Sequence, residues 1–276
     1  MVDFVIPAGT QPRDVASCFA GWASMRNEPS VRFVLPAESL HAWTIALLGA
    51  MAADRHLRGL ENVVAPSNET TVRGLLAKSA IEWPRATTMK SSVGFLELLQ
   101  PINDLKAART MADQVGDAME AVTPSTSPSV ARMTRFVFEE LGANIVQHSG
   151  RPETGYGFAA IEPDKRQLEL GFADAGAGFR ASLQRNPELE GRIDDDAEAL
   201  QLALTPRITG TSTPRTNMGI GLKALTDFSD LLAGELFIAS GSAMLRRGTA
   251  AGQRTNVIHS IPPWPGTWIS FRSFIG

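Results

Sequence analysis

The segment from Arg135 to Ser149 constrains the chain most, because one predicted helix carries both an apolar face and a separate polar stripe. Glu140, Asn144 and His148 are spaced four residues apart, so they lie on the same side of that helix. The apolar face consists of Phe136, Val137, Leu141 and Ile145. Since an apolar helix face must be covered by other elements, the helix packs against a core while presenting a carboxylate, an amide and an imidazole together.

Two glycine motifs follow this helix. A β-hairpin is predicted at 156–161 and 167–172, with its turn at 162–165, and the motif Asp174-Ala-Gly-Ala-Gly178 comes directly after the second strand. About 38 residues without a strand signal follow, a length typical of a lid over a binding site. The second motif, Asn217-Met-Gly-Ile-Gly221, then opens a predicted helix through Leu222.

Glycines let the backbone approach phosphate groups closely, and a helix N-terminus attracts anions. Each motif alone is equally explained by a tight turn or a helix entry. A Rossmann or P-loop site is disfavoured, because Gly219 is not part of a GxGxxG element and the sequence has no GxxxxGK[ST] run.

The first 90 residues predict a small α/β unit. A strand at 31–35 precedes a helix that begins at Ser39, and a strand at 60–64 precedes a helix that begins at Asn68 or Thr70. This alternation predicts parallel strands joined by crossover helices. We therefore expect two domains, residues 1–90 and residues 91–276. The second begins with a strand at 95–99 and a helix at 104–122, and ends with strands at 236–240 and 268–274.

Composition narrows the possible partners and compartments. The net charge of −3 is too close to zero to indicate a general affinity for nucleic acid or for an acidic membrane. Cys18 is the only cysteine, which excludes an internal disulfide and fits a reducing compartment. The N-terminal residues do not have the pattern of a signal peptide, and no apolar run reaches the length of a membrane span. We expect a cytoplasmic protein.

Taken together and in order, the motifs resemble those of the GHKL superfamily of ATPase domains. Glu140-Leu-Gly-Ala-Asn144 with His148 resembles its N box, and the two glycine motifs resemble its two glycine boxes. Gly266-Thr267 resembles the Gly-Thr pair that these domains carry before their last strand. The resemblance covers residues 95–274. It implies a Bergerat-type α+β sandwich for residues 91–276, with a mixed sheet covered by helices on one face.

The resemblance also implies ATP and Mg²⁺ as cofactors and assigns residue roles. Glu140 would act as the general base, Asn144 would bind Mg²⁺ through its amide oxygen, and Asp174 would accept a hydrogen bond from the adenine amino group. The other residues expected to bind the nucleotide are His148, Gly176, Gly178, Asn217, Gly219, Gly221, Leu222 and Thr267. Two interpretations of His148 remain open: contact with the phosphates, or a histidine at a helix C-terminus whose charge the helix dipole favours.

Other residues fit simpler roles. Arg207 and Arg215 lie in the expected lid and are candidates for phosphate contacts or for solvated loop residues. Asp194, Asp195 and Asp196 fit a capped helix start better than a metal cluster. Trp264 and Trp268 fit the core better than a stacking surface.

Within the superfamily, the chain looks most like the anti-sigma-factor serine kinases, which phosphorylate a Ser or Thr of a STAS-domain partner. The predicted unit at 1–90 looks like a fused STAS-like module by topology, in which Ser39 is either a phosphate acceptor or a helix N-cap. A second hypothesis is a nucleotide-sensing module that changes partner affinity without catalysis, and a third is a structural domain that binds no nucleotide. Whether the protein forms a homodimer stays open.

Overall fold

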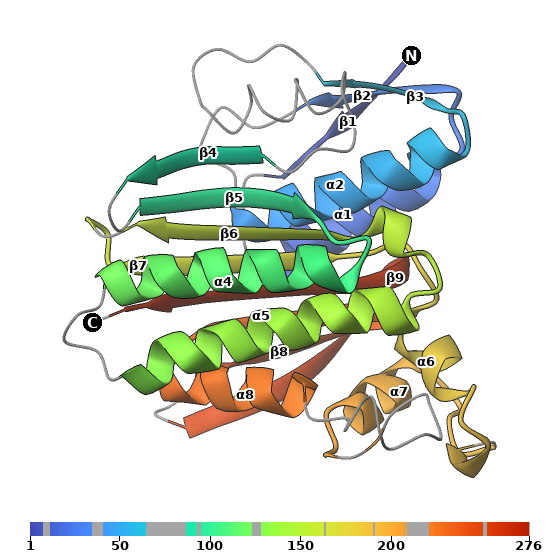
Figure 1. Cartoon of the computed structure of the whole chain (residues 1–276). Helices are drawn as coiled ribbons and strands as arrows, with labels where there is room; N and C mark the ends of the chain where they lie inside the picture. The colour runs from blue at the N-terminus through green and yellow to red at the C-terminus, as the bar shows by residue number, and fades with distance from the viewer. Residues whose placement is uncertain are drawn as a thin grey trace.

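The computed structural model describes residues 1–7, 12–34, 41–64, 87–92, 95–122, 128–162, 164–189, 191–206, 208, 221–250 and 253–275. They form an α+β protein with a small and a large β-sheet (Figure 1). The strands are β1 (Val2–Val5), β2 (Ser30–Val34), β3 (Glu61–Val64), β4 (Thr87–Ser92), β5 (Phe95–Pro101), β6 (Tyr156–Glu162), β7 (Gln167–Ala173), β8 (Glu235–Ala250) and β9 (Gln253–Phe274). The α-helices are α1 (Pro12–Met25), α2 (Ala42–Leu57), α4 (Leu105–Val122), α5 (Pro128–His148), α6 (Gly178–Leu183), α7 (Asp196–Ala203) and α8 (Gly221–Leu231).

The small sheet has the order β1-β2-β3, and both of its strand pairings are parallel. Along β2 the side chains alternate, with Val31 and Phe33 buried and Arg32 exposed. The connections α1 and α2 each return the chain to the same end of the sheet, which is why the strands run parallel. The predicted parallel strands at 31–35 and 60–64 are confirmed. Ser39 and the helix predicted from Asn68 or Thr70 lie outside the described residues.

The large sheet has the order β4-β5-β6-β7-β9-β8, and every neighbouring pair is antiparallel. The expectation of a mixed sheet is therefore wrong. The reason is the number of helices between strands: β5 is followed by two helices, α4 and α5, that run in opposite directions along the sheet (Figure 1). A single crossover helix would have brought β6 back parallel to β5, whereas a helix pair brings it back antiparallel.

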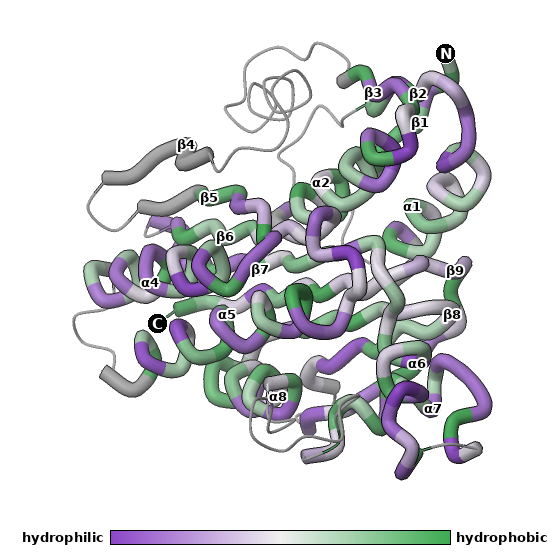
Figure 2. The backbone as a smooth tube through the Cα atoms, turned by 45° about the vertical axis from the view of Figure 1, so that its right-hand side comes forward, coloured by the Kyte–Doolittle hydropathy of each residue, from purple (hydrophilic) through white to green (hydrophobic). Residues whose placement is uncertain are grey.

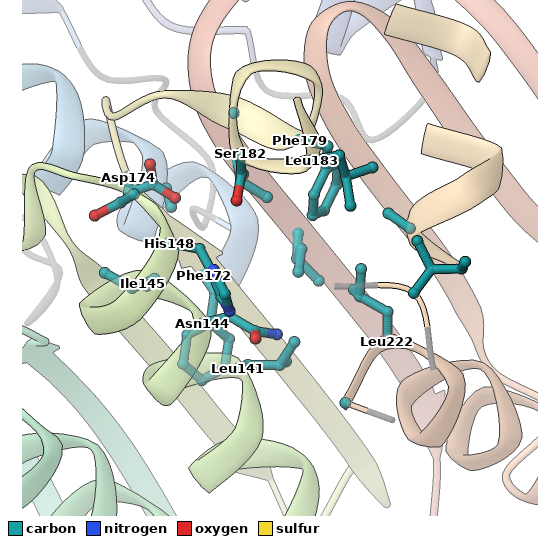
Figure 3. A pocket seen from close by; sticks show the side chains of 18 residues that line it. Leu141, Asn144, Ile145, His148, Phe172, Asp174, Phe179, Ser182, Leu183 and Leu222 are labelled. Atoms are coloured by element: carbon teal, nitrogen blue, oxygen red, sulfur yellow. The ribbon is translucent and has the colours of Figure 1, made fainter. Parts of the chain in front are cut away.

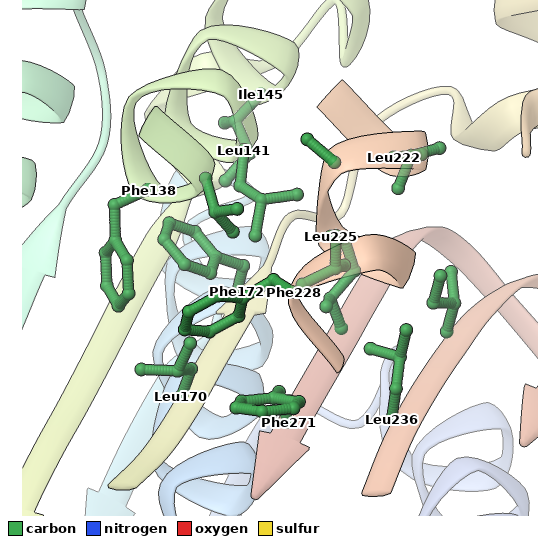
Figure 4. Packing of buried hydrophobic residues seen from close by; sticks show 14 of the residues in the cluster. Phe138, Leu141, Ile145, Leu170, Phe172, Leu222, Leu225, Phe228, Leu236 and Phe271 are labelled. Carbon is green, nitrogen blue, oxygen red and sulfur yellow. The ribbon is translucent and has the colours of Figure 1, made fainter. Parts of the chain in front are cut away.

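One face of the large sheet is covered by α4, α5 and α8. The aromatic rings in this layer meet in pairs, since the ring centroids of Phe138 and Phe172 are 5.2 Å apart and those of Phe228 and Phe271 are also 5.2 Å apart. Figure 4 shows these rings between the helices and the strands, with Leu141 and Leu225 above them. This core fixes α5 and α8 against the sheet, and both helices carry residues of the predicted site.

The opposite face of the large sheet is covered by α1 and α2. The helices of residues 91–276 cover one face, as expected, and the second cover comes from the first 90 residues, which the sequence did not predict to pack there. The ring of Trp268 in β9 lies 5.5 Å from Trp43 of α2 and 5.9 Å from Phe19 of α1. Trp264 and Trp268 are fully buried, as expected for core residues. Successive residues of a strand point to opposite faces, and β9 is apolar on both, so both faces need cover.

Hydropathy distinguishes the helices of the two layers. Figure 2 shows α2 predominantly green, as expected for a helix buried against the sheet, whereas purple and green alternate along α4, whose outer side is exposed.

The strand β4 spans the expected boundary near residue 90 and pairs with β5 in the large sheet. Within the described residues, no helix combines the length and the apolar composition that a membrane crossing requires.

Candidate functional site

A pocket opens between α5, the end of β7, α6, α8 and β9 (Figure 3). The space between its walls is about 810 Å³ when the open solvent at its mouth is counted. Its wall contains many of the residues expected at an ATP site: Asn144, His148, Asp174, Gly178, Gly221, Leu222 and Thr267. These residues come from four separate stretches of the sequence, and the fold brings them together.

Asp174 lies at the end of β7 with its carboxyl group at the pocket wall and only 3% of the residue exposed. Its backbone amide donates to the Thr267 carbonyl oxygen over 2.9 Å, and its Oδ1 accepts from the Gly176 amide over 2.8 Å. Burial raises the pKa of Asp174 to about 7, although backbone hydrogen bonds from Gly176 and Thr267 act in the opposite direction. A buried carboxylate of this kind favours a ligand that offers a hydrogen-bond donor.

The first glycine motif fits closely around this carboxylate. A Cβ on Gly176 would lie 2.2 Å from the Ser149 carbonyl oxygen, so no other residue fits there without a backbone shift. Gly178 has a φ of +70°, which favours glycine, and a Cβ there would lie 2.6 Å from Ser240 Oγ. Gly176 itself is not part of the pocket wall; its role in the structure is to let the loop pass the end of α5.

The second glycine motif is described from Gly221 onward. Gly221 is the first residue of α8 and lines the pocket together with the next residue, Leu222. The pocket wall therefore contains a helix N-terminus, where backbone amides and the helix dipole favour an anion. Asn217, Gly219, Arg207 and Arg215 lie outside the described residues, so their predicted roles stay predictions.

The polar stripe of α5 meets the start of α8. A Cβ on Gly221 would lie 3.1 Å from Glu140 Oε2 and 3.3 Å from Asn144 Nδ2, so both side chains reach the same point on the α8 N-terminus. Asn144 lines the pocket, whereas Glu140 does not. The pKa of Glu140 is raised, first by burial and then by the neighbouring Glu139. Glu140 is therefore a stronger base than an ordinary surface glutamate.

These oxygen donors fit the chemistry of Mg²⁺, which takes one or two protein oxygens and completes its shell with phosphates and water. Among the residues that the structure describes, no three His, Cys, Asp or Glu side chains group closely enough to hold a metal ion. Asn144, with Glu140 one turn away, would hold Mg²⁺ only in the company of a bound phosphate group. Asp195 is the N-cap of α7, as expected for that acidic run.

His148, the last residue of α5, also lines the pocket. Its pKa is lowered, mainly by burial and also by the positive charge of Arg185. The interpretation of His148 as a charged residue at a helix C-terminus is therefore disfavoured, because burial and the charge of Arg185 both favour the neutral imidazole. A neutral imidazole at this place offers one donor and one acceptor to a ligand.

Several pocket residues were not anticipated from the sequence, namely Phe172, Phe179, Ser182, Leu183, Ala203 and Ile208. Phe179, Ser182 and Leu183 belong to α6, which begins inside the first glycine motif (Figure 3). The spacing of four between Phe179 and Leu183 was a helical signal within the expected lid. These apolar side chains form a wall against which a flat aromatic ring can pack.

A scan against protein-family models and a search of curated proteins give no match to this chain. The assignment of the site therefore depends on its geometry and on the motifs themselves.

Proposed function

We propose that this pocket binds ATP together with Mg²⁺, as in the GHKL superfamily, and that the protein is a cytoplasmic regulator of a protein partner. One observation carries the proposal: a buried carboxylate (Asp174), an amide oxygen donor (Asn144) and a helix N-terminus (Gly221) all border one pocket with an apolar wall. Each matches one part of ATP. The carboxylate accepts from the adenine amino group, the apolar wall packs on the ring, and the helix N-terminus faces the phosphates.

The proposed reaction is phosphoryl transfer to a Ser or Thr of a STAS-type partner, the activity of the anti-sigma-factor kinases. The hydroxyl oxygen forms a bond to the γ-phosphorus while the bond from that phosphorus to the bridging oxygen of ADP breaks. Glu140 accepts the hydroxyl proton, a task for which its raised pKa suits it. Bound Mg²⁺ would neutralise charge on the phosphates, and Asn144 would hold the ion in place.

A non-catalytic nucleotide sensor is the second candidate, and the position of Glu140 favours it. Glu140 is not part of the pocket wall, although Asn144 one turn later is. A base outside the pocket contacts the attacking hydroxyl only if the partner brings that hydroxyl to it. In the sensing alternative, bound ATP changes the affinity for the partner without any transfer.

Calorimetry with ATP and Mg²⁺ tests the binding itself. We expect the wild-type protein to bind ATP and Asp174→Asn to bind it at least about tenfold more weakly. The substitution replaces a carboxylate oxygen, which accepts a hydrogen bond, by an amide whose NH2 group donates one and so faces the adenine amino group as a second donor. The exposed Asp164, in the turn between β6 and β7, provides the matched control Asp164→Asn, which should bind normally. If the wild-type protein binds no adenine nucleotide, the proposal is wrong.

Glu140→Gln separates catalysis from sensing. Labelled ATP with candidate STAS partners measures transfer, and the same partners measure nucleotide-dependent binding. Loss of transfer with partner binding retained supports the kinase, whereas a wild-type protein that binds ATP and partner without transfer supports the sensor. Glu61→Gln alters an exposed carboxylate of β3 in the small sheet and serves as the control.

A further inference from the structure

A buried aspartate of α2 connects the N-terminal helices with the loop that follows α5. The Asp54 side chain is fully buried and attracts three guanidinium groups. Its Oδ1 accepts from Arg151 Nη1 over 2.6 Å, while its Oδ2 lies 2.9 Å from Arg58 Nη2 and 3.6 Å from Arg26 Nη2. Arg58 is the C-cap residue of α2, and Arg26 follows α1. Of the three, only Arg151 comes from outside the first 90 residues.

Arg151 extends this connection to the first glycine motif. The same Nη1 that donates to Asp54 also lies 3.3 Å from the Ala175 carbonyl oxygen and donates to it. The Ala175 amide in turn donates to Thr154 Oγ1 over 2.9 Å, and Thr154 Oγ1 donates to the Arg151 carbonyl oxygen over 2.8 Å. The carbonyl group and the amide of Ala175 are therefore both hydrogen-bonded to residues of the segment after α5.

The loop that contains Ala175 also positions the residue of the proposed adenine contact. Ala175 lies between Asp174 and Gly176, and the Gly176 amide donates to the Asp174 carboxylate. The Ala177 amide donates to the Ser149 carbonyl oxygen over 2.7 Å, which fixes the other end of the loop. A shift of Arg151 would therefore move the Ala175 peptide group and, with it, the amide that orients Asp174.

We infer that Asp54 and Arg151 are positioning residues for nucleotide recognition, through which the N-terminal helices α1 and α2 regulate the affinity of the pocket. This inference depends on the proposed ATP binding. A buried carboxylate holds its cations only while both keep their geometry, so a displacement of α2 weakens the Asp54–Arg151 contact and releases the Ala175 carbonyl oxygen. A signal or partner that acts on α1 and α2 would thus change ATP affinity without touching the pocket.

The chain contains a matched pair of arginines for the test. Arg58→Met and Arg151→Met each remove one cation from Asp54, and the two side chains are similarly exposed, at 30% and 34%. Only Arg151 also contacts the glycine motif. We expect both variants to lose thermal stability, and Arg151→Met alone to lose about tenfold in ATP affinity, a usual size for coupling between sites. The preference for ATP over GTP should fall with it, a change that a general loss of stability does not produce.

A double-mutant cycle sharpens the result. Asp54→Asn and Arg151→Met should lower ATP affinity by the same factor, and the double variant by little more than either single variant, because both act on one contact. Hydrogen exchange at the Gly176 and Ala177 amides should accelerate in Arg151→Met and not in Arg58→Met, even without nucleotide. The inference is overturned if wild-type protein binds ATP and Arg151→Met binds it equally well, or if Arg58→Met is equally impaired. Absence of ATP binding by wild-type protein would instead reject the proposed function, and this inference with it.

Discussion

At the scale of single residues, Asp174 combines recognition with a cost in stability. The fold buries its carboxyl group, which raises its pKa. Backbone hydrogen bonds lower the pKa, but no basic side chain does so. An ionised carboxylate in this position is destabilising until a ligand donates to it. The proposed adenine contact would provide that donor. The charge of Asp174 therefore lowers the folding stability of the free protein and contributes to ligand binding.

The pH dependence of stability tests this view of Asp174. Its pKa is near 7 in the folded protein, above the ordinary 3.8, so the folded state holds the proton more tightly than the unfolded state does. Stability without nucleotide should thus fall as pH rises from about 4 to about 7, by at most about 4 kcal/mol from this group. Urea unfolding of wild-type protein and Asp174→Asn at pH 5 and pH 8 measures the difference. An identical pH dependence in both proteins would contradict the assignment.

The polar stripe of α5 shows what residue spacing predicts and what it does not. The spacing of four correctly predicted that Glu140, Asn144 and His148 share one side of the helix. The pocket wall extends along α5 from Leu141 to His148, however, so it covers nearly the whole length of the stripe and still omits Glu140. Asn144 and His148 lie in the wall, and Glu140 lies beyond it next to Gly221. The pocket limits depend on α6 and α8, which the spacing within α5 does not reveal.

At the scale of elements, an irregularity in β8 organises the small helices beside the pocket. The pairing of β8 with β9 shifts register between Ser240 and Ala243, and Gly241 there has a φ of +57°. On one side of this bulge, Ser240 Oγ accepts from the Phe179 amide at the start of α6. On the other, Asp196 of α7 accepts from the Ser242 amide and hydroxyl. One bulge thus fixes the starts of two helices.

Replacement of Ser240 by alanine tests this role of the bulge. The part-buried Phe179 amide would lose its acceptor, which should cost about 0.5–1.5 kcal/mol of unfolding free energy. Because Phe179 lines the pocket, nucleotide affinity should fall as well. Urea unfolding and calorimetry measure the two effects, with Ser260→Ala on the exposed part of β9 as the control. Wild-type behaviour of Ser240→Ala in both measurements would show that α6 is held by other contacts.

The prediction of elements from sequence succeeded where the signal was local. The helix at 104–122, the hairpin at 156–172 and the alternating strand at 268–274 all formed, because periodicity and turn residues act over a few neighbours. Strand β1, in which only Phe4 is buried, was missed, and strand direction was missed because it depends on how many helices intervene. Those helices pack through contacts between residues far apart in the chain, which no short window contains.

At the scale of the whole molecule, the two predicted units share one core. Rings from α1 and α2 pack on β9, with the centroids of Phe19 and Trp264 at 5.6 Å and those of Trp22 and Trp264 at 6.0 Å. Phe237 of β8 packs on Trp268 in the same layer. Without α1 and α2, this face of the large sheet would expose several large aromatic side chains. The N-terminal helices are therefore part of the scaffold of the pocket as well as its proposed regulator.

A shared core predicts that the described parts of the chain unfold together. Phe19→Ala removes a fully buried ring and should cost about 3–5 kcal/mol. Trp22, Trp43, Trp264 and Trp268 all lie in this core, so tryptophan fluorescence reports its loss while circular dichroism reports secondary structure. We expect both signals to change in one coincident transition in wild-type protein and to shift together in Phe19→Ala. Phe274→Ala, which alters a ring that is 72% exposed, should shift neither by more than about 1 kcal/mol. Two separate transitions would contradict a shared core, because they would mean that α1 and α2 detach from β9 while the large sheet stays folded.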